Sequence, residues 1–235
     1  MRVRLNFKIT EFPLAYRLLI LSYIKQAVRS QSESFYHSFF VCNEKQAKPF
    51  VFAPYFQNLE IKDDLIYAEN LQVTVTSSNL EFLIYLINGC QQNKNFSYKN
   101  YSLLLTKVEL LKEKQINKSK VWFKTLSPIL IETKEGKPVL PNSNNFEKEL
   151  NYITSKIIES IDGRELYRPL TILASNLKKS VIKENYHQSQ SNYLFYTASK
   201  GSLCIEGHPC DLNFIYQNGL GLRRSTGFGC LEIIE

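Results

Sequence analysis

The hydrophobic patterns of this chain repeat one order of elements in its two halves, and that order limits the fold more than any other feature. Residues 2–9 alternate apolar and polar side chains, which is the period of a half-buried strand. The next five segments are predicted to be a helix, two strands, a helix and a strand, over residues 15–30, 50–56, 65–76, 80–88 and 101–111. Asn79 is the predicted N-cap of the second helix, and Gly89 its predicted stop. This βαββαβ order is typical of a ferredoxin-like unit.

A polar, charged stretch over residues 112–120 is the predicted linker, and the order of elements then repeats. The predicted segments are a strand pair broken at Pro128, a helix, a strand, two strands joined at Gly201, a helix and a last strand, over residues 121–133, 145–161, 170–181, 192–205, 211–217 and 227–234. We therefore predict an α+β fold of two tandem ferredoxin-like domains, 1–117 and 118–235, with a glycine-rich loop near the C-terminus.

The composition is sufficient for packed hydrophobic cores and shows no pattern of a disulfide-rich, metal-binding or membrane-spanning protein. Of 235 residues, 44% are hydrophobic, and the net charge of +7 is compatible with a nucleic-acid partner without proving one. The five cysteines form no C-x-x-C motif, and the three histidines have no zinc spacing. We expect no metal, no cofactor and a cytoplasmic protein with reduced thiols. A strand pattern opens the chain and no apolar run reaches the length of a membrane span, so neither a signal peptide nor a membrane partner is expected.

Four of the nine glycines lie in residues 219–229, the glycine-rich run, whose sequence is GLGLRRSTGFG. Glycine lets backbone N–H groups approach a bound group, and adjacent arginines offer phosphate donors of fixed geometry. The run is not a GxxxxGK[ST] loop, and it is not a GxGxxG motif because Arg224 stands three positions after Gly221. We interpret it as a clamp for a polymer phosphate backbone. The alternative is a glycine-rich hairpin with two solvated arginines.

The pattern G-x-G-x-R-R-S-x-G-F-G resembles the signature of the CRISPR-associated repeat-RNA endoribonucleases, the Cas-six type of the repeat-associated RNA-binding superfamily. Residues 48–56 and 126–129 resemble two further landmarks of that family, and the likeness covers nearly the whole chain in the same order. The resemblance implies tandem ferredoxin-like domains and an RNA-binding role for the glycine-rich run. The residues so implied are Gly219, Gly221, Arg223, Arg224, Ser225, Gly227 and Gly229.

The resemblance also implies an activity: metal-independent, sequence-specific endoribonuclease cleavage of CRISPR repeat RNA within precursor crRNA. In such a reaction the 2′-hydroxyl attacks the adjacent phosphorus, with general acid and base catalysis, and leaves a 2′,3′-cyclic phosphate on the mature crRNA. A histidine suits the proton transfers because its ordinary pKa is near 6.5. The alternative is a catalytically weak or inactive subunit that binds repeat RNA in a CRISPR effector complex.

The family's catalytic set is a tyrosine on the first helix, a histidine just after it and a lysine before the next strand. On this sequence these positions correspond to Tyr23, His37 and Lys48. Tyr23 also lies on the apolar stripe of its helix, so a core role is the alternative, and Lys45 is an alternative to Lys48. The other two histidines, His187 and His208, have no evident partner in the sequence.

The implied partner is CRISPR repeat RNA in precursor crRNA, and the role belongs to antiviral defence. The sequence does not decide whether the repeat must form a stem-loop, whether the protein is a homodimer, or whether it joins an effector complex. A tandem RNA-recognition module is a third hypothesis. It is disfavoured because no strand has the aromatic K/R-G-F/Y-G/A-F-V pattern.

Overall fold

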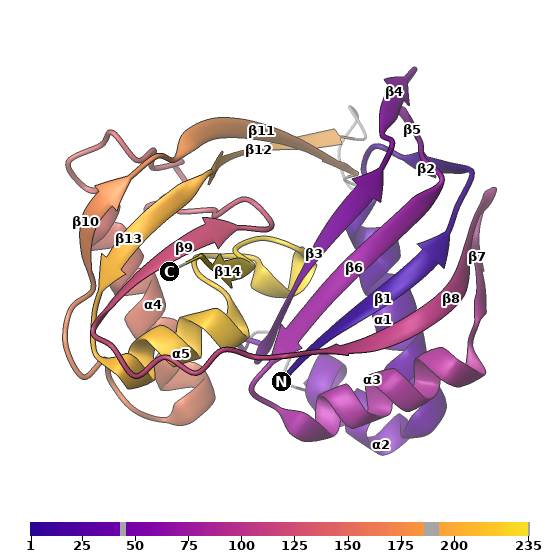
Figure 1. Ribbon diagram of the computed structural model, residues 1–235, viewed down its shortest axis with the longest axis horizontal. Coiled ribbons are helices and arrows are strands. Elements are labelled where there is room, and N and C mark those ends of the chain that lie inside the picture. Colours follow the sequence, from indigo (N-terminus) through magenta and orange to yellow (C-terminus); the bar gives the residue numbers. More distant parts are fainter. Residues whose placement is uncertain (43–45, 186–192, 235) are drawn as a thin grey trace. The chain divides into compact units, whose positions relative to one another are not determined.

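The computed structural model describes residues 1–42, 46–185 and 193–234 (Figure 1). The chain forms two compact units. Unit 1 comprises Met1–Lys45, Pro54–Lys112 and Lys183–Leu194, and unit 2 comprises Gln46–Ala53, Glu113–Ile182 and Phe195–Glu235. No helix in the described part of the chain is both long enough and apolar enough to cross a membrane.

Unit 1 is ferredoxin-like. Its main elements are β1 (Arg2–Lys8), α1 (Arg17–Gln31), β3 (Phe50–Gln57; only the part from Pro54 belongs to this unit), β6 (Asn70–Ser77), α3 (Leu80–Gln92), β7 (Asn95–Tyr98) and β8 (Tyr101–Leu111). The strands form one sheet in the order β3, β6, β1, β8, β7, and β1 runs antiparallel to both β6 and β8 (Figure 1). Apart from β7, the strands therefore lie in the order second, third, first, fourth, with a helix after the first and the third.

The alternation in β1 places one face of the strand in the core, as predicted from the sequence. Val3, Leu5 and Phe7 are at most 1% exposed, and Val3 and Leu5 pair with Val75 and Val73 of β6. The predicted strand over 65–76 is instead two elements: β5 (Leu65–Tyr67), which pairs with β2 (Glu11–Pro13) and β4 (Glu60–Lys62) in a small sheet, and β6. Two short helical segments, α2 (Glu33–Tyr36) and the π-helix η1 (His37–Cys42), follow α1.

Helix α3 begins as predicted and ends later than predicted. The Asn79 side chain accepts a hydrogen bond from the Phe82 amide at 2.8 Å, which is an N-cap. The helix passes through Gly89 and ends at Gln92, so the prediction of a stop at Gly89 was wrong. A Cβ added at Gly89 would lie 1.9 Å from the Ala27 carbonyl oxygen of α1. Glycine is needed there because the two helix backbones pack closely.

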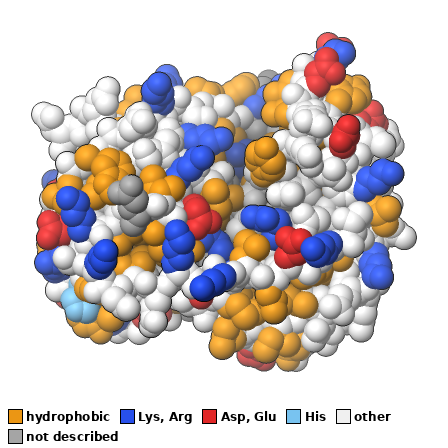
Figure 2. All heavy atoms as spheres, in the orientation of Figure 1, with side chains coloured by type: hydrophobic (Ala, Val, Ile, Leu, Met, Phe, Trp, Pro, Cys, Tyr) orange, Lys and Arg blue, Asp and Glu red, His pale blue; other side chains and the backbone are white. Residues whose placement is uncertain are grey.

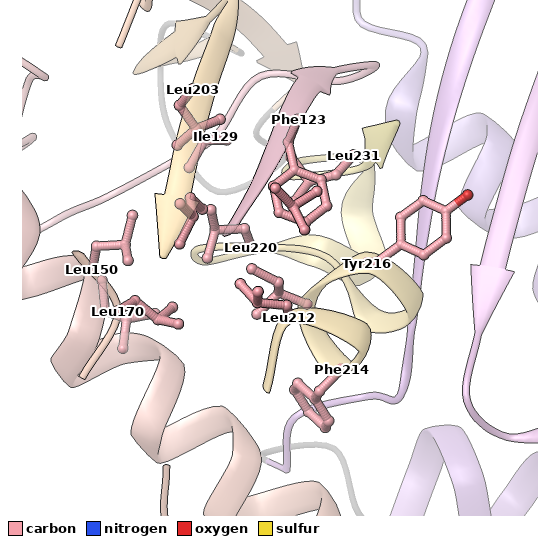
Figure 3. Packing of buried hydrophobic residues seen from close by; sticks show 14 of the residues in the cluster. Phe123, Ile129, Leu150, Leu170, Leu203, Leu212, Phe214, Tyr216, Leu220 and Leu231 are labelled. Atoms are coloured by element: carbon pink, nitrogen blue, oxygen red, sulfur yellow. The ribbon is translucent and has the colours of Figure 1, made fainter. Parts of the chain in front are cut away.

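Unit 2 repeats the same arrangement. Its elements are β9 (Lys120–Thr125), α4 (Phe146–Asp162), β10 (Thr171–Ser175), β13 (Ser202–Glu206), α5 (Pro209–Asn218) and β14 (Leu231–Ile233). The sheet order is β10, β13, β9, β14, which is again second, third, first, fourth. Side chains from the strands, both helices and the intervening loops meet in its core (Figure 3); they include Phe123, Leu150, Leu203, Leu212 and Leu231, each fully buried. The predicted tandem ferredoxin-like fold is confirmed.

Three predicted boundaries in unit 2 were wrong for identifiable reasons. The last strand is Leu231–Ile233 and not 227–234, because Gly227 and Gly229 have positive φ values that a strand cannot contain. The first strand ends at Thr125, and in the described residues beyond Pro128 the predicted second strand is replaced by isolated bridges, which join Ile129 to Ser199 and Glu132 to Pro138. The stretch 170–181 holds β10 and the start of a second strand, β11 (Lys178–Asn185), which pairs with β12 (Tyr193–Lys200).

The end of β11 (residues 183–185) and the start of β12 (residues 193–194) belong to unit 1, and two ion pairs within that unit involve β11. Arg17 Nη1 of α1 lies 2.9 Å from Glu184 Oε1, and both side chains are buried. Burial raises the pKa of Glu184 above its ordinary value, and the bond from Arg17 opposes that effect. Lys183 Nζ lies 2.5 Å from Asp64 Oδ2 at the surface.

Replacing Gly89 by alanine tests the close packing of α1 and α3. In an exposed helix Gly→Ala stabilises by about 0.5–1 kcal/mol, but here the methyl group would overlap the Ala27 carbonyl. We expect Gly89→Ala to lower the free energy of unfolding by about 1–3 kcal/mol in urea denaturation. The control is Asn88→Ala at the exposed neighbouring position, which we expect to be neutral or stabilising. An alanine at 89 that stabilised the protein would contradict the packing described.

Candidate functional site

The glycine-rich run leaves the C-terminus of α5 and turns sharply several times before β14. Gly219, Gly221, Gly227 and Gly229 have φ values of +84°, +85°, +88° and +73°. Side chains other than glycine rarely adopt this region, so the backbone path itself requires glycine at these positions.

The four glycines pack against the protein's own core. An added Cβ would lie 1.9 Å from the Leu220 carbonyl oxygen at Gly229 and 2.6 Å from the Leu130 carbonyl oxygen at Gly221. The other two glycines contact side chains at the start of β3: an added Cβ would lie 2.9 Å from Val51 Cβ at Gly219 and 2.7 Å from the Phe52 ring at Gly227. This packing explains the glycines without a ligand, and contact of the run with RNA stays a prediction.

Backbone and side-chain hydrogen bonds within unit 2 join the three segments on which the family resemblance rests. Ser127 Oγ donates to the Phe52 carbonyl at 3.4 Å and accepts from the Cys230 amide at 2.9 Å. The Gly229 amide donates to the Pro128 carbonyl at 2.7 Å. The landmark residues 126–129 therefore connect the start of β3 to the glycine-rich run, a function of Ser127 that the sequence did not reveal.

The two adjacent arginines of the run have opposite surroundings. Arg224 is 4% exposed, and its Nη1 donates to the Asn218 carbonyl at 2.6 Å. Burial lowers the pKa of its guanidinium below the usual value. Arg223 is exposed, and its guanidinium lies 4.6 Å from the centre of the Tyr196 ring. Arg223 is thus available to a phosphate, while Arg224 holds the turn together.

The short 3-10 helix η2 (Arg224–Thr226) follows Arg223, whose φ of +53° turns the chain into it. Ser225 is half-buried in this turn. Among the described residues, no protein acceptor pairs with the backbone amides of Arg224 and Ser225, whereas the amides of Thr226 and Gly227 donate to Arg223 and Arg224 carbonyls. Two amides beside an exposed arginine are donors suited to phosphate oxygens.

Tyr196 supports Arg223 and was not singled out from the sequence. Its ring lies under the Arg223 guanidinium and makes an edge contact of 5.6 Å with Phe228 in the glycine-rich run. The sequence feature that could have indicated it is the alternation of β12, in which Tyr196 is half-buried and its neighbour Phe195 is exposed. An arginine held over an aromatic ring loses less side-chain freedom when it binds an anion.

His37 lies in unit 1 at the start of η1, and its side chain is exposed. Ser32 caps the preceding helix α2 by accepting from the Phe35 amide at 3.1 Å, and the His37 amide donates back to the Glu33 and Ser34 carbonyls. The His37 Nδ1 atom lies 3.2 Å from Cys42 Sγ. The imidazole is therefore at the surface, where a substrate can reach it.

Tyr23 is a core residue of unit 1. It is 1% exposed, its hydroxyl donates to the Asn93 carbonyl at 3.2 Å, and its ring contacts Phe7 and Phe96 edge-on. Burial raises the pKa of this phenol well above its ordinary value, so it is a poor proton donor at neutral pH. The catalytic role stays a prediction that this geometry does not support.

Lys48 lies in unit 2, half-buried, just before β3. Its neighbour Ala47 packs against the unit 2 core, and three residues later Val51 contacts Gly219 of the glycine-rich run. The structure thus places the chain next to Lys48 against that run. The alternative, Lys45, lies outside the described residues.

The remaining candidates are structural or lie outside the described residues. His208 is the N-cap of α5, where its Nδ1 accepts from the Cys210 amide at 3.3 Å, and His187 lies outside the described residues. No group of three or more His, Cys, Asp or Glu side chains in the described part of the chain could hold a metal ion. All five cysteines are free.

Lysines and arginines are spread among acidic and apolar side chains on the face shown in Figure 2.

Solved structures share this fold over the entire chain. A RAMP protein described as binding different RNA substrates superposes with a TM-score of 0.83 at 19% identity, covering 100% of both chains. The product of a Cas6-related gene from Pyrococcus furiosus superposes with a TM-score of 0.82 at 20% identity, covering 100% of this chain and 99% of that one. The chain therefore shares the fold of these two proteins.

Sequence comparison narrows the class. The family model for the C-terminal part of CRISPR-associated protein Cas6 matches residues 111–233, more than half of the chain. The CRISPR-associated endoribonuclease-like protein Cas6 of Pyrococcus furiosus is 23% identical over 181 residues, which cover 72% of this chain and 70% of that protein. The chain belongs to the Cas6 family.

Separate substitution of the two arginines tests their opposite roles. Arg224→Ala removes the hydrogen bond that the guanidinium donates to the buried Asn218 carbonyl, so we expect the free energy of unfolding to fall by about 1–3 kcal/mol. Arg223→Ala removes an exposed side chain, so we expect stability to change by less than about 0.5 kcal/mol. If Arg223 contacts phosphate, this variant binds repeat RNA more weakly, and the slope of log K against log salt falls by about one. Urea denaturation measures the stabilities, and filter binding at several salt concentrations measures the affinities. Equal destabilisation by both variants would contradict a structural role for Arg224 alone.

Proposed function

We propose that this protein is a metal-independent endoribonuclease that cuts CRISPR repeat RNA within precursor crRNA and leaves a 2′,3′-cyclic phosphate. The observation that carries the proposal is an exposed imidazole, His37, on a chain that belongs to the Cas6 family. A relative named endoribonuclease-like supports the reaction class, and a structural neighbour described as binding different RNA substrates supports RNA as the ligand.

The chemistry follows from the substrate. RNA carries its own nucleophile, because the 2′-hydroxyl can attack the adjacent phosphorus and expel the 5′-oxygen of the next nucleotide. The protein has to take a proton from the 2′-hydroxyl, give one to the leaving oxygen and stabilise negative charge on the phosphoryl group. Histidine can perform either proton transfer near neutral pH. His37 takes this role in our proposal, and it needs no metal to do so.

We assign charge stabilisation and RNA retention to unit 2. Arg223 and the amides of Arg224 and Ser225 bind the phosphate backbone, and Lys48 offsets charge on the phosphoryl oxygens. Arg224 and the four glycines act indirectly, by giving the turn its shape. We leave Tyr23 out of the proposed catalytic group, because its hydroxyl is buried and already bonded.

Substitution of His37 is predicted to separate catalysis from binding. A general acid or base contributes about 10²- to 10⁴-fold, so His37→Ala should slow single-turnover cleavage by that factor. The affinity for repeat RNA should remain within twofold, because we assign RNA retention to unit 2 and only proton transfer to His37. His208→Asn, which keeps an acceptor at its helix N-cap, is the control histidine and should cleave at the wild-type rate. A fully active His37→Ala protein would remove the catalytic assignment.

A pair of RNA substrates tests the mechanism directly. Labelled repeat RNA is incubated with the protein in excess EDTA, beside the same RNA with a single 2′-deoxy nucleotide at the cleavage position. We expect the first RNA to be cut and the second to remain intact, because only the first carries the nucleophile. Cleavage that depends on added Mg²⁺ would reject the mechanism.

The second candidate function is a repeat-RNA-binding subunit of a CRISPR effector complex with little or no cleavage. The buried state of Tyr23 favours it, since one of the three predicted catalytic groups is withdrawn from solvent. Tight binding of repeat RNA without cleavage of the all-ribose substrate would support this function over the first.

A further inference from the structure

The π-helical turn η1 brings together two side chains that an α-helix would separate. In an α-helix, residues five positions apart point about 140° away from each other around the axis. A π-helix closes i→i+5 hydrogen bonds, and its wider turn brings such residues toward the same face. His37 and Cys42 are the first and last residues of η1, five apart, and Nδ1 lies 3.2 Å from Sγ. Both side chains are exposed.

A sulfur atom beside Nδ1 affects which ring nitrogen carries the proton. The 3.2 Å contact fits two arrangements: Nδ1–H donates to the sulfur, or the thiol S–H donates to Nδ1. In the first arrangement Nε2 of the neutral ring carries no proton. The hydrogen bond made by one ring nitrogen sets the protonation of the other. When Nδ1–H donates to Cys42, the neutral ring has a lone pair on Nε2, on the side of the ring away from Cys42. The protonated ring has Nε2–H at the same position, as a donor.

We propose that Cys42 is a positioning residue for His37: the thiol accepts a hydrogen bond from Nδ1–H and leaves Nε2 as the atom that exchanges protons with RNA. This inference rests on the proposed function, because it assigns the geometry of the histidine used there. Cys42 itself does not touch the substrate.

Aromatic packing within unit 1 holds the π turn in place. Phe40 of η1 is 7% exposed, and Phe39 stacks on Phe82 of α3 with ring centres 5.2 Å apart. Phe39 and Phe40 also contact each other edge-on at 4.9 Å. These two consecutive rings anchor the middle of η1 on α3, so the two ends of the turn are held at a defined separation.

Nearby charged side chains have partners other than the His37 ring. Glu33 lies one turn before His37, and Arg29 Nε donates to Glu33 Oε2 at 2.7 Å. The bond from Arg29 is the main reason that the pKa of Glu33 is lowered. Lys25 lies over the Phe40 ring, with Nζ 5.4 Å from its centre. The hydrogen-bond contact at His37 Nδ1 is made by the Cys42 sulfur.

Nitrogen NMR of the free protein tests the hydrogen bond without reference to activity. We expect His37 to be mainly the Nδ1–H tautomer in the wild type and in Cys42→Ser, because a hydroxyl also accepts from Nδ1–H. In Cys42→Ala the population should shift toward Nε2–H, the tautomer that an isolated neutral imidazole prefers. Circular dichroism establishes that each variant is folded.

Cleavage measures the consequence for the reaction. Loss of one hydrogen bond predicts that Cys42→Ala cuts repeat RNA about fivefold more slowly in single turnover, with unchanged affinity, and that Cys42→Ser recovers most of the rate. The matched control is Cys210→Ala, which removes the other exposed cysteine and should cut at the wild-type rate. An unchanged tautomer and rate in Cys42→Ala overturn the role of Cys42 alone. A wild-type protein that cuts no repeat RNA overturns the proposed function instead.

Discussion

The close approach of the glycine-rich run to the start of β3 and to residues 126–130 is the constraint on which the rest of unit 2 depends. The run contacts Val51 and Phe52 at distances that no Cβ would permit, and Ser127 bonds to the backbone on both sides. Because the glycine backbone packs directly against these side chains, the contact tolerates little displacement. It closes the ferredoxin-like unit after α5 and leads the chain into the last strand.

The same constraint explains why two identical residues side by side do different work. The turn at Arg223, with its positive φ, sends one guanidinium outward over Tyr196 and the next inward to the Asn218 carbonyl. Burial of Arg224 costs solvation free energy, which the bond to a backbone carbonyl partly offsets. The phosphate-binding capacity that we propose for the run is therefore attached to a rigid support, which lowers the entropy lost on binding.

The sequence predicted correctly the features that interactions within short segments determine. The alternation in β1, the Asn79 cap and the element order of both halves are properties of short segments, and each is seen in the structure. It failed where a distant neighbour decides. The sequence predicts a helix stop at Gly89, whereas in the structure α1 passes so close that glycine is required inside the helix. The burial of Tyr23 likewise depends on distant residues, since Phe7 and Phe96 contact its ring edge-on, while its catalytic role stays a prediction.

By itself, the sequence determined the tandem ferredoxin-like architecture and the Cas6 family, because hydrophobic period and the spacing of glycines and arginines are written along the chain. It also made His37 the histidine to examine. Only the tertiary structure decided which of these side chains face solvent: His37 and Arg223 do, and Tyr23 and Arg224 do not. It alone showed Cys42 beside the His37 ring. Exposure and proximity depend on residues distant in the chain, and a linear pattern carries no record of them.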